Sequence, residues 1–218
     1  MLFHMARNGR AASGFVIAGG KSSRMGTDKA FLEFGGQTLL ERALGAMSAV
    51  CDRVSIVGDP AKFQTHLSDK SGSANYESVV ADVFTGCGPL AGIHAALLHS
   101  TAELNLMLAV DMPFASSELL AFLVAAAKLC PAMITVPRTS KGFQPLCAVY
   151  RRDFLSAAEK ALRAGNYKID AAFSGVAIRV IEAGELAAAD FSEQSFFNLN
   201  TPQDHRMAGG RGLSKMTE

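Results

Sequence analysis

A glycine-rich segment with several basic side chains lies near the start of the chain, directly after a short apolar run. The apolar run covers residues 14–18, and residues 19–29 then read GGKSSRMGTDK, with three glycines, two serines, one arginine and two lysines. Glycine lets backbone N–H groups approach phosphate oxygens closely, and lysine and arginine neutralise the phosphate charge. The segment therefore predicts a phosphate-binding loop, and a solvated basic loop is the alternative.

The spacing of this loop differs from that of two common phosphate-binding loops. A Walker A loop requires a glycine five residues before Gly20, where this chain has Phe15, inside the apolar run. A dinucleotide-binding loop requires G-x-G-x-x-G, but here two adjacent glycines are followed by a third only at Gly26. The sequence therefore predicts a phosphate-binding loop of another type.

An aspartate stands at the end of a strongly apolar run. Residues 103–110 are typical of a buried strand, and Asp111 follows them, two residues before Pro113. In open α/β sheets, ligands bind beyond the carboxyl ends of the strands, and Mg²⁺ prefers one or two carboxylates together with phosphate oxygens and water. Asp111 is therefore a candidate magnesium ligand. The alternative is that it only begins a turn.

Two asparagines lie close together near the carboxyl end of the chain. Residues 196–200 are predicted as a last short strand, in which Asn198 and Asn200 would point to the same face. Such paired amides could bind a polar substrate, or they could only organise the turn that follows. Thr201 and Asp204 are expected to form a capping box at the start of a helix.

Apolar spacing predicts an alternation of strands and helices around these residues. Strands are expected at residues 14–18, 53–58, 76–80, 103–110, 132–137, 145–150 and 177–181, and helices at residues 38–50, 61–67, 88–99, 116–128 and 153–164. Uniformly apolar strands that alternate with helices favour a parallel sheet covered on both faces. We therefore expect an α/β protein with a Rossmann-like, three-layer α/β/α arrangement and a mainly parallel, twisted sheet.

Composition excludes several functional classes. The formal net charge of +1 provides no overall field toward nucleic acid or anionic lipid, so neither is expected as a partner. The four cysteines form no C-x-x-C pair, which argues against zinc-ribbon and thioredoxin-like sites and favours a reducing compartment. Because no apolar run is long enough to span a bilayer and residues 1–13 do not resemble a signal peptide, we expect a cytoplasmic protein.

The motifs together resemble one family. Residues 17–29, IAGGKSSRMGTDK, are similar to the signature of the MobA-like nucleotidyltransferases. The segments GPLAGI at residues 88–93 and VDMP at residues 110–113 resemble the family's second glycine loop and its metal-binding turn. The segments QPLCAVY at residues 144–150 and FNLNTP at residues 197–202 resemble the part that is specific to molybdenum cofactor guanylyltransferases. The resemblance covers roughly residues 14–204.

The resemblance implies a reaction, a fold type and a set of partners. It implies transfer of GMP from GTP to the terminal phosphate of molybdopterin, with release of pyrophosphate and with Mg²⁺ as the cofactor. The implied fold is that of the nucleotide-diphospho-sugar transferases. Transient contacts with other cofactor-biosynthesis proteins and with recipient molybdoenzymes are also implied.

The resemblance also implies roles for individual residues. Arg24, Lys29 and Asp111 are the implied catalytic residues, and Asp111 is the implied metal ligand. Nucleotide binding is implied for Ile17, Ala18, Gly19, Gly20, Arg24, Gly26, Lys29, Val57, Asp82, Gly88 and Asp111. Acceptor binding is implied for Gln144, Asn198 and Asn200.

One nucleotidyltransferase domain is expected between a flexible arm at residues 1–13 and a disordered tail at residues 208–218. Within residues 14–207, residues 14–113 would form the nucleotide-binding half and residues 114–207 the acceptor-binding half. Two other functions remain open. The chain could use CTP or a sugar phosphate acceptor with the same fold, or it could be a non-catalytic nucleotide-binding module.

Overall fold

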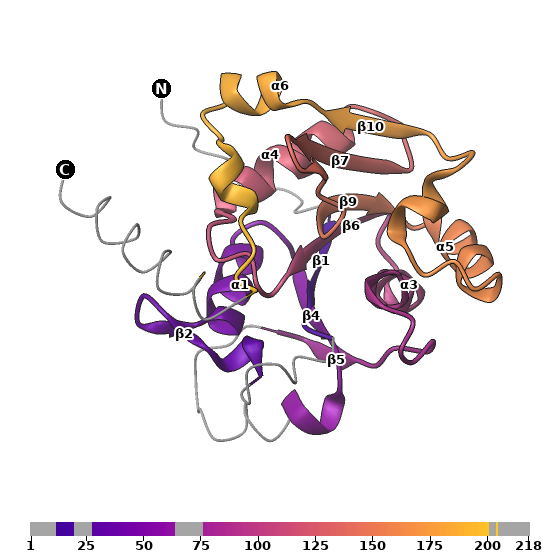
Figure 1. Ribbon diagram of the computed structural model, residues 1–218, viewed down its shortest axis with the longest axis horizontal. Helices are drawn as coiled ribbons and strands as arrows, with labels where there is room; N and C mark the ends of the chain where they lie inside the picture. The colour runs from indigo at the N-terminus through magenta and orange to yellow at the C-terminus, as the bar shows by residue number, and fades with distance from the viewer. Residues whose placement is uncertain (1–11, 20–27, 64–75, 201–203, 205–218) are drawn as a thin grey trace.

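The computed structural model describes residues 12–19, 28–63, 76–200 and 204, and it centres on one twisted sheet (Figure 1). The strands are β1 (Ala12–Ile17), β2 (Glu33–Phe34), β3 (Gln37–Thr38), β4 (Arg53–Val57), β5 (Ser78–Val80), β6 (Leu104–Ala109), β7 (Ile134–Thr139), β8 (Gly142–Phe143), β9 (Cys147–Arg151) and β10 (Ile178–Ile181). The helices are α1 (Leu39–Ser48), α3 (Pro89–His99), α4 (Ser117–Lys128), α5 (Phe154–Arg163) and α6 (Ala183–Ala188). Short 3-10 turns occupy Lys29–Phe31, Ile169–Phe173 and Glu193–Phe196.

The main sheet has the strand order β10-β7-β9-β6-β1-β4-β5, with β8 paired to β7. Parallel pairing joins β5, β4, β1 and β6, and also joins β7 and β10. These pairings confirm the predicted mainly parallel α/β sheet, and the seven strands predicted up to residue 181 have ends within two residues of the expected ones. Strands from both predicted halves of the domain belong to this sheet, because β6 pairs directly with β9.

Strand β9 runs antiparallel to both of its neighbours, which the sequence did not predict. The chain leaves β7 at Thr139, forms β8 through a tight turn, and enters β9 at Cys147. A parallel return would need a crossover of about a dozen residues or more, and residues 140–146 are too few for one. The chain therefore has to reverse its direction at this point.

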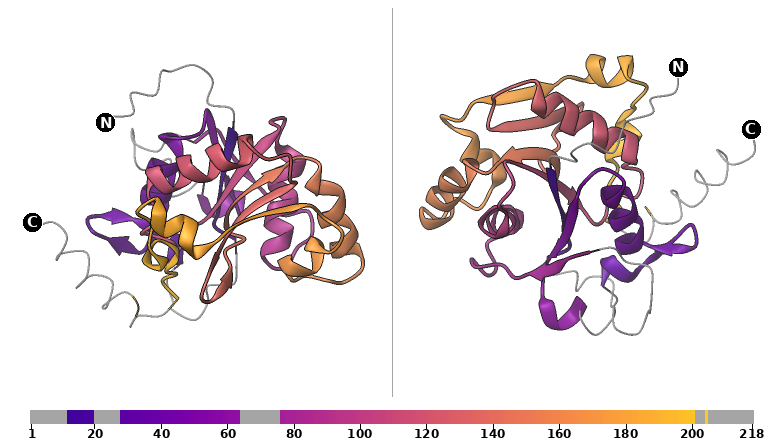
Figure 2. Two further views of the ribbon diagram at one scale, coloured as in Figure 1. Left: turned by 90° about the horizontal axis from the view of Figure 1, so that it is seen from above. Right: turned by 180° about the vertical axis from the view of Figure 1, so that it is seen from behind.

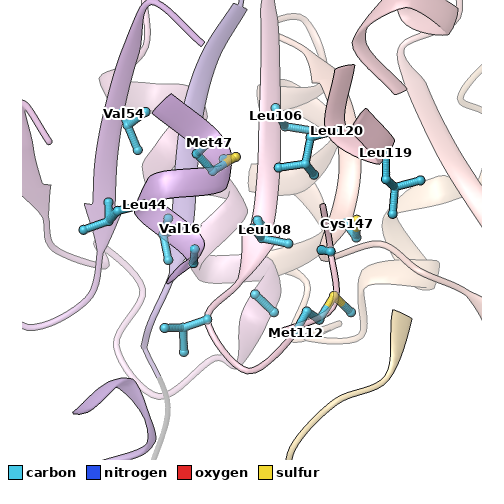
Figure 3. Close-up of a cluster of buried hydrophobic side chains, with 14 of the residues drawn as sticks. Val16, Leu44, Met47, Val54, Leu106, Leu108, Met112, Leu119, Leu120 and Cys147 are labelled. Atoms are coloured by element: carbon cyan, nitrogen blue, oxygen red, sulfur yellow. The ribbon is translucent and has the colours of Figure 1, made fainter. Parts of the chain in front are cut away.

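Helices cover both faces of the sheet. Helices α1 and α4 pack on one face, whereas α3 and α5 pack on the other (Figures 1 and 2). Strand β1 serves both layers because its side chains alternate: Val16 belongs to the core under α1 and α4, and Phe15 and Ile17 belong to the core under α3 and α5. Figure 3 shows the first of these cores, where side chains of α1 and α4 meet those of the central strands.

A small hairpin precedes α1 and was missed by the sequence analysis. Strands β2 and β3 pair in antiparallel fashion across Gly35 and Gly36, which have φ angles of 62° and 81°. Two consecutive positive φ angles are the requirement of the tight hairpin turn whose twist matches the flanking strands, and glycine adopts them at no steric cost. The strands have only two residues each, so they carry little apolar periodicity.

Helix α1 begins with a capping box. The Thr38 hydroxyl accepts a hydrogen bond from the Glu41 backbone N–H, and the Glu41 carboxylate accepts one from the Thr38 backbone N–H. We expect Thr38→Ala to lower the free energy of unfolding by about 1 kcal/mol, because it leaves an N–H of the first turn without its partner. Urea denaturation would measure this, with Thr38→Ser as the control. A threonine-to-alanine change without loss of stability would contradict the assignment.

The predicted strand at residues 196–200 is wrong. The 3-10 turn Glu193–Phe196 occupies its start, and residues 197–200 have no regular structure. This segment is held by the burial of Phe196 and Leu199 and by a hydrogen bond from the Leu199 N–H to the Asp111 carbonyl, 2.9 Å long. The apolar side chains that suggested a strand are anchors for a segment that crosses the end of the sheet.

Some predictions concern residues at the ends of the described ranges. Strand β1 already begins at Ala12, which pairs with Leu104, so the domain starts before the predicted boundary at residue 14. Of the helix predicted at residues 61–67, residues 61–63 are helical and the others lie outside the described residues. The Thr201 cap, most of the predicted arm and the predicted tail also lie outside them. In the described part of the chain, no helix is long and apolar enough to cross a membrane.

Candidate active site

A cleft opens at the carboxyl ends of β1 and β6, which lie side by side in the sheet. It is lined by Ile17, Ala18, Gly19, Asp28, Lys29, Pro89, Ala109, Val110, Asp111 and Leu146. The strands place their last residues, Ile17 and Ala109, in register, and Pro89 contributes the first turn of α3. A helix N-terminus and exposed backbone beside a strand end form a favourable site for an anion.

The floor of the cleft is held by backbone hydrogen bonds that continue beyond the strands. The Ala18 N–H donates to the Val57 carbonyl at 2.9 Å, and the Val110 N–H donates to the Ile17 carbonyl at 3.1 Å. The residues just after β1 and β6 are therefore fixed to their neighbours. This places the described start of the glycine loop and Asp111 at one rigid edge.

The Lys29 side chain joins two predicted site residues that are distant in sequence. Its Nζ donates to Asp111 Oδ2 at 3.2 Å and to Asn200 Oδ1 at 2.7 Å. The side chains of Lys29 and Asp111 are 22% and 20% exposed, so a ligand in the cleft can reach both. A residue of the glycine loop, the candidate metal ligand and a candidate acceptor residue thus meet at one point.

Asp28 orients Lys29 and was assigned no role from the sequence. Its carboxylate Oδ1 accepts a hydrogen bond from the Ala30 N–H at 3.0 Å and so caps the 3-10 turn that begins with Lys29. An aspartate one residue before a short turn is a recognised capping signal, which could have identified this role from the sequence. Asp28 also lines the cleft itself.

The two predicted acceptor asparagines lie in different environments. Asn200 is exposed, its side-chain oxygen accepts from Lys29, and its backbone N–H donates to Asp204. The Asn198 Oδ1 is buried and has no hydrogen-bond partner within the described residues. Because this segment is not a strand, the expectation that the two side chains share a face loses its basis.

Asp82 lies beside the glycine loop and helix α3. A Cβ atom added to Gly19 would lie 3.6 Å from Asp82 Oδ2, and one added to Gly92 would lie 3.8 Å from Asp82 Oδ1. Within the described residues, Oδ1 is buried without a hydrogen-bond partner, and burial raises the pKa of this carboxyl group. A carboxylate oxygen that is buried without a hydrogen bond reduces stability, and carboxyl groups with a shifted pKa are concentrated at functional sites.

Folding raises the pKa of the Asp82 carboxyl group, so this group binds a proton more readily in the folded chain than in the unfolded chain. The free energy of unfolding therefore falls as the pH rises through the pKa of Asp82. We expect Asp82→Asn, which cannot ionise, to be more stable than the wild type at pH 7, and this difference should shrink toward pH 4. Urea denaturation across this range measures the effect, with the exposed, non-titrating Ser156→Ala as the control. A difference that does not vary with pH would contradict the prediction.

Three other residues that were predicted to belong to the site are not among the residues that line the cleft. Val57 is fully buried, and its contact with the glycine loop is made by its backbone carbonyl, which accepts a hydrogen bond from the Ala18 N–H. Gly88 is exposed just before α3 and has a φ angle of 72°, which favours glycine. The Gln144 side-chain amide donates to Thr139 Oγ1 at 3.0 Å and is outside the described lining of the cleft, to which the nearby Leu146 contributes.

The described residues of the cleft can be compared with the metal site and the basic loop that the sequence predicts. The described residues contain no cluster of three or more His, Cys, Asp or Glu side chains that could hold a metal alone. Asp111, a partly exposed carboxylate beside the predicted phosphate-binding loop, is nevertheless a donor that suits Mg²⁺, which takes its other ligands from phosphate and water. Arg24, Gly20 and Gly26 lie outside the described residues.

Comparisons with known proteins point to one family. The family model described as the MobA-like NTP transferase domain matches residues 14–176. A protein of Pelotomaculum thermopropionicum named probable molybdenum cofactor guanylyltransferase is 35% identical over 193 residues, which cover 88% of this chain and 89% of that protein. The molybdenum cofactor guanylyltransferase of Desulfosudis oleivorans is 32% identical and covers 89% and 92%.

Solved structures with the same fold include proteins with different names. The molybdopterin-guanine dinucleotide biosynthesis protein A of Archaeoglobus fulgidus aligns with a TM-score of 0.79 and 28% identity, over 93% of this chain and 99% of that chain. The 4-diphosphocytidyl-2C-methyl-D-erythritol synthase of Anaerococcus prevotii aligns with a TM-score of 0.67 and 20% identity, over 93% and 96%. The second likeness concerns the fold alone.

Proposed function

Because the chain belongs to the MobA-like NTP transferase family, we propose that it transfers GMP from GTP to the terminal phosphate of molybdopterin. In this reaction an oxygen of the acceptor phosphate attacks the α-phosphorus of GTP. The bond between that phosphorus and the oxygen bridging to the β-phosphate breaks, and pyrophosphate leaves. The product contains molybdopterin and GMP joined through two phosphates.

The observation that carries this proposal is the meeting of Lys29 with Asp111 and Asn200. The acceptor phosphate is itself the nucleophile, so catalysis requires positioning and charge stabilisation and no nucleophile from the protein. Lys29 would stabilise negative charge on the triphosphate and the leaving pyrophosphate. Asn200 contacts the same ammonium group. It would hold the segment with the candidate acceptor-binding residues Asn198 and Asn200 next to the reacting phosphates.

Magnesium belongs to the proposal as the expected cofactor. Asp111 would hold it, and the glycine loop with Lys29 and Arg24 would bind the phosphates around it. When bound, the ion would neutralise charge on the phosphate oxygens during the transfer. The role of Asp111 in the protein is to present a carboxylate from the rigid end of β6, where its backbone is fixed by the Leu199 hydrogen bond.

GTP is favoured over CTP by the named relatives and by the segment FNLNTP at residues 197–202. The fold cannot discriminate, since a cytidylyl enzyme shares it. The test is to incubate the purified protein with Mg²⁺, molybdopterin and GTP, CTP or ATP, and to measure pyrophosphate release. We expect release with GTP, and release with CTP but not GTP would overturn the assignment.

The same contacts bear on the alternative that the chain is a non-catalytic nucleotide-binding module. A non-catalytic module would have no need for Lys29 to contact both Asp111 and Asn200, so the contacts favour an enzyme. Transient contacts with other cofactor-biosynthesis proteins and recipient molybdoenzymes, and a cytoplasmic location, stay predictions.

A further inference from the structure

Lys62 lies just after strand β4 and contacts the segment that carries Lys29, although no role has been assigned to it. Its ammonium group forms an ion pair with Asp28 Oδ2. It also lies over two aromatic rings, 5.7 Å from the centre of Phe31 and 4.6 Å from the centre of Phe63. Three contacts from one side chain, which is 24% exposed, fix the position of the ammonium group.

Asp28 links this ammonium group to the candidate active site. One carboxylate oxygen pairs with Lys62, and the other accepts from the Ala30 N–H and caps the turn Lys29–Phe31. Lys29 is the first residue of that turn, and its side chain reaches Asp111 and Asn200. A displacement of the Asp28 carboxylate would therefore shift the backbone from which Lys29 extends.

The residue after Lys62 anchors it to the end of β4. Phe63 is fully buried, and a Cβ atom added to Gly58 would lie only 2.6 Å from its ring. A side chain at Gly58 would force the ring to move, so the close contact requires glycine here. Lys62 thus extends from a segment that packs tightly against the sheet, and it has a rigid base from which to hold Asp28.

We propose that Lys62 is a positioning residue for Lys29 and acts through the Asp28 carboxylate. This proposal rests on the proposed function, in which Lys29 stabilises charge during the transfer. Without the Lys62 charge, the Asp28 carboxylate loses its ionic partner, and the turn that presents Lys29 loses one of its supports. A small displacement of a charge-stabilising group lowers the rate of the chemical step more than it lowers nucleotide binding.

The first test compares Lys62→Met with Lys62→Arg in the pyrophosphate-release assay. The methionine variant keeps an apolar stem but removes the charge, and we expect a kcat lowered by about three- to tenfold, with a KM for GTP within about twofold of the wild type. The arginine variant keeps the charge, and it should retain at least about half of the wild-type kcat. Lys160→Met, on the exposed surface of α5, is the matched control and should behave like the wild type.

The second test asks whether Lys62 acts through Lys29. In a Lys29→Ala background, Lys62→Met should cause almost no further loss of kcat, because the group that it positions is gone. An equal loss in both backgrounds would overturn the proposal, and so would a Lys62→Met variant with wild-type kcat. Should Lys62→Met fail to fold, Asp28→Asn, which removes the carboxylate charge, takes its place in the same cycle.

A third measurement does not depend on which reaction is catalysed. The Ala30 N–H donates to Asp28, so its hydrogen-exchange protection should fall in Lys62→Met and be preserved in Lys62→Arg. Absence of turnover with every nucleotide would refute the proposed function, and this measurement would still decide whether Lys62 holds the turn. Unchanged protection of Ala30 in Lys62→Met would overturn the positioning role by itself.

Discussion

Asp111→Asn is expected to lower GTP-dependent pyrophosphate release by roughly 10²–10³-fold while the protein stays folded. The substitution replaces a carboxylate with a neutral amide of the same shape at the end of β6. It removes the candidate metal ligand and the charged partner of Lys29, whose Nζ lies 3.2 Å from Asp111 Oδ2. The backbone carbonyl that accepts from Leu199 is unchanged, so the crossing segment should keep its position.

The measurement is kcat as a function of Mg²⁺ concentration, together with circular dichroism and thermal unfolding to check the fold. Asp153→Asn is a suitable control, because Asp153 is an exposed aspartate before α5 that makes no side-chain capping bond. The control should retain full activity. Comparable turnover of Asp111→Asn and the wild type at saturating Mg²⁺ would contradict the proposal that Asp111 is a metal ligand.

Lys29→Ala is expected to lower kcat/KM for GTP by more than about tenfold, on the scale of losing a charge-assisted contact. The structure adds a second consequence. Because Lys29 Nζ also donates to Asn200 Oδ1, its loss releases the link between the cleft and the candidate acceptor segment. We therefore expect the KM for molybdopterin to rise in this variant as well.

Steady-state kinetics with each substrate varied in turn separates the two effects. Lys128→Ala, an exposed lysine in the last turn of α4, is the control for removal of a positive charge and should leave both constants unchanged. An unchanged kcat/KM for GTP in Lys29→Ala would exclude Lys29 from the site. A reduced value with an unchanged KM for molybdopterin would keep Lys29 at the triphosphate and separate Asn200 from acceptor binding.

The sheet and its edge were predictable from local patterns. Buried parallel strands are uniformly apolar, so the run before the glycine loop and the run before Asp111 could be identified without knowledge of their neighbours. Parallel strands end at the same edge of a sheet, and in the structure the ends of β1 and β6 bring Gly19 and Asp111 to one cleft. The existence of β9 was predicted, but its antiparallel direction was not predictable from its composition, because a buried strand is apolar in either direction.

The contacts of Asn200 and Lys62 show what local patterns cannot convey. Asn200 lies 171 residues from Lys29, in a segment whose apolar residues imitate a strand, yet its amide meets the Lys29 ammonium group. Lys62 is an ordinary basic residue in the sequence, and its pairing with Asp28 depends on how the chain turns after β4.

By itself, the sequence of this protein determined the α/β class and the family resemblance, and it predicted a phosphate-binding first loop, because each depends on residues that are close together in the chain. Only the tertiary structure decided that Lys29 lies between Asp111 and Asn200, that Asp28 caps the Lys29 turn while pairing with Lys62, and that Asn198 and Asn200 face different surroundings. The physical reason is that a side-chain contact depends on where distant segments cross the edge of the sheet. That crossing follows from the packing of the whole chain, and no short stretch of sequence specifies it.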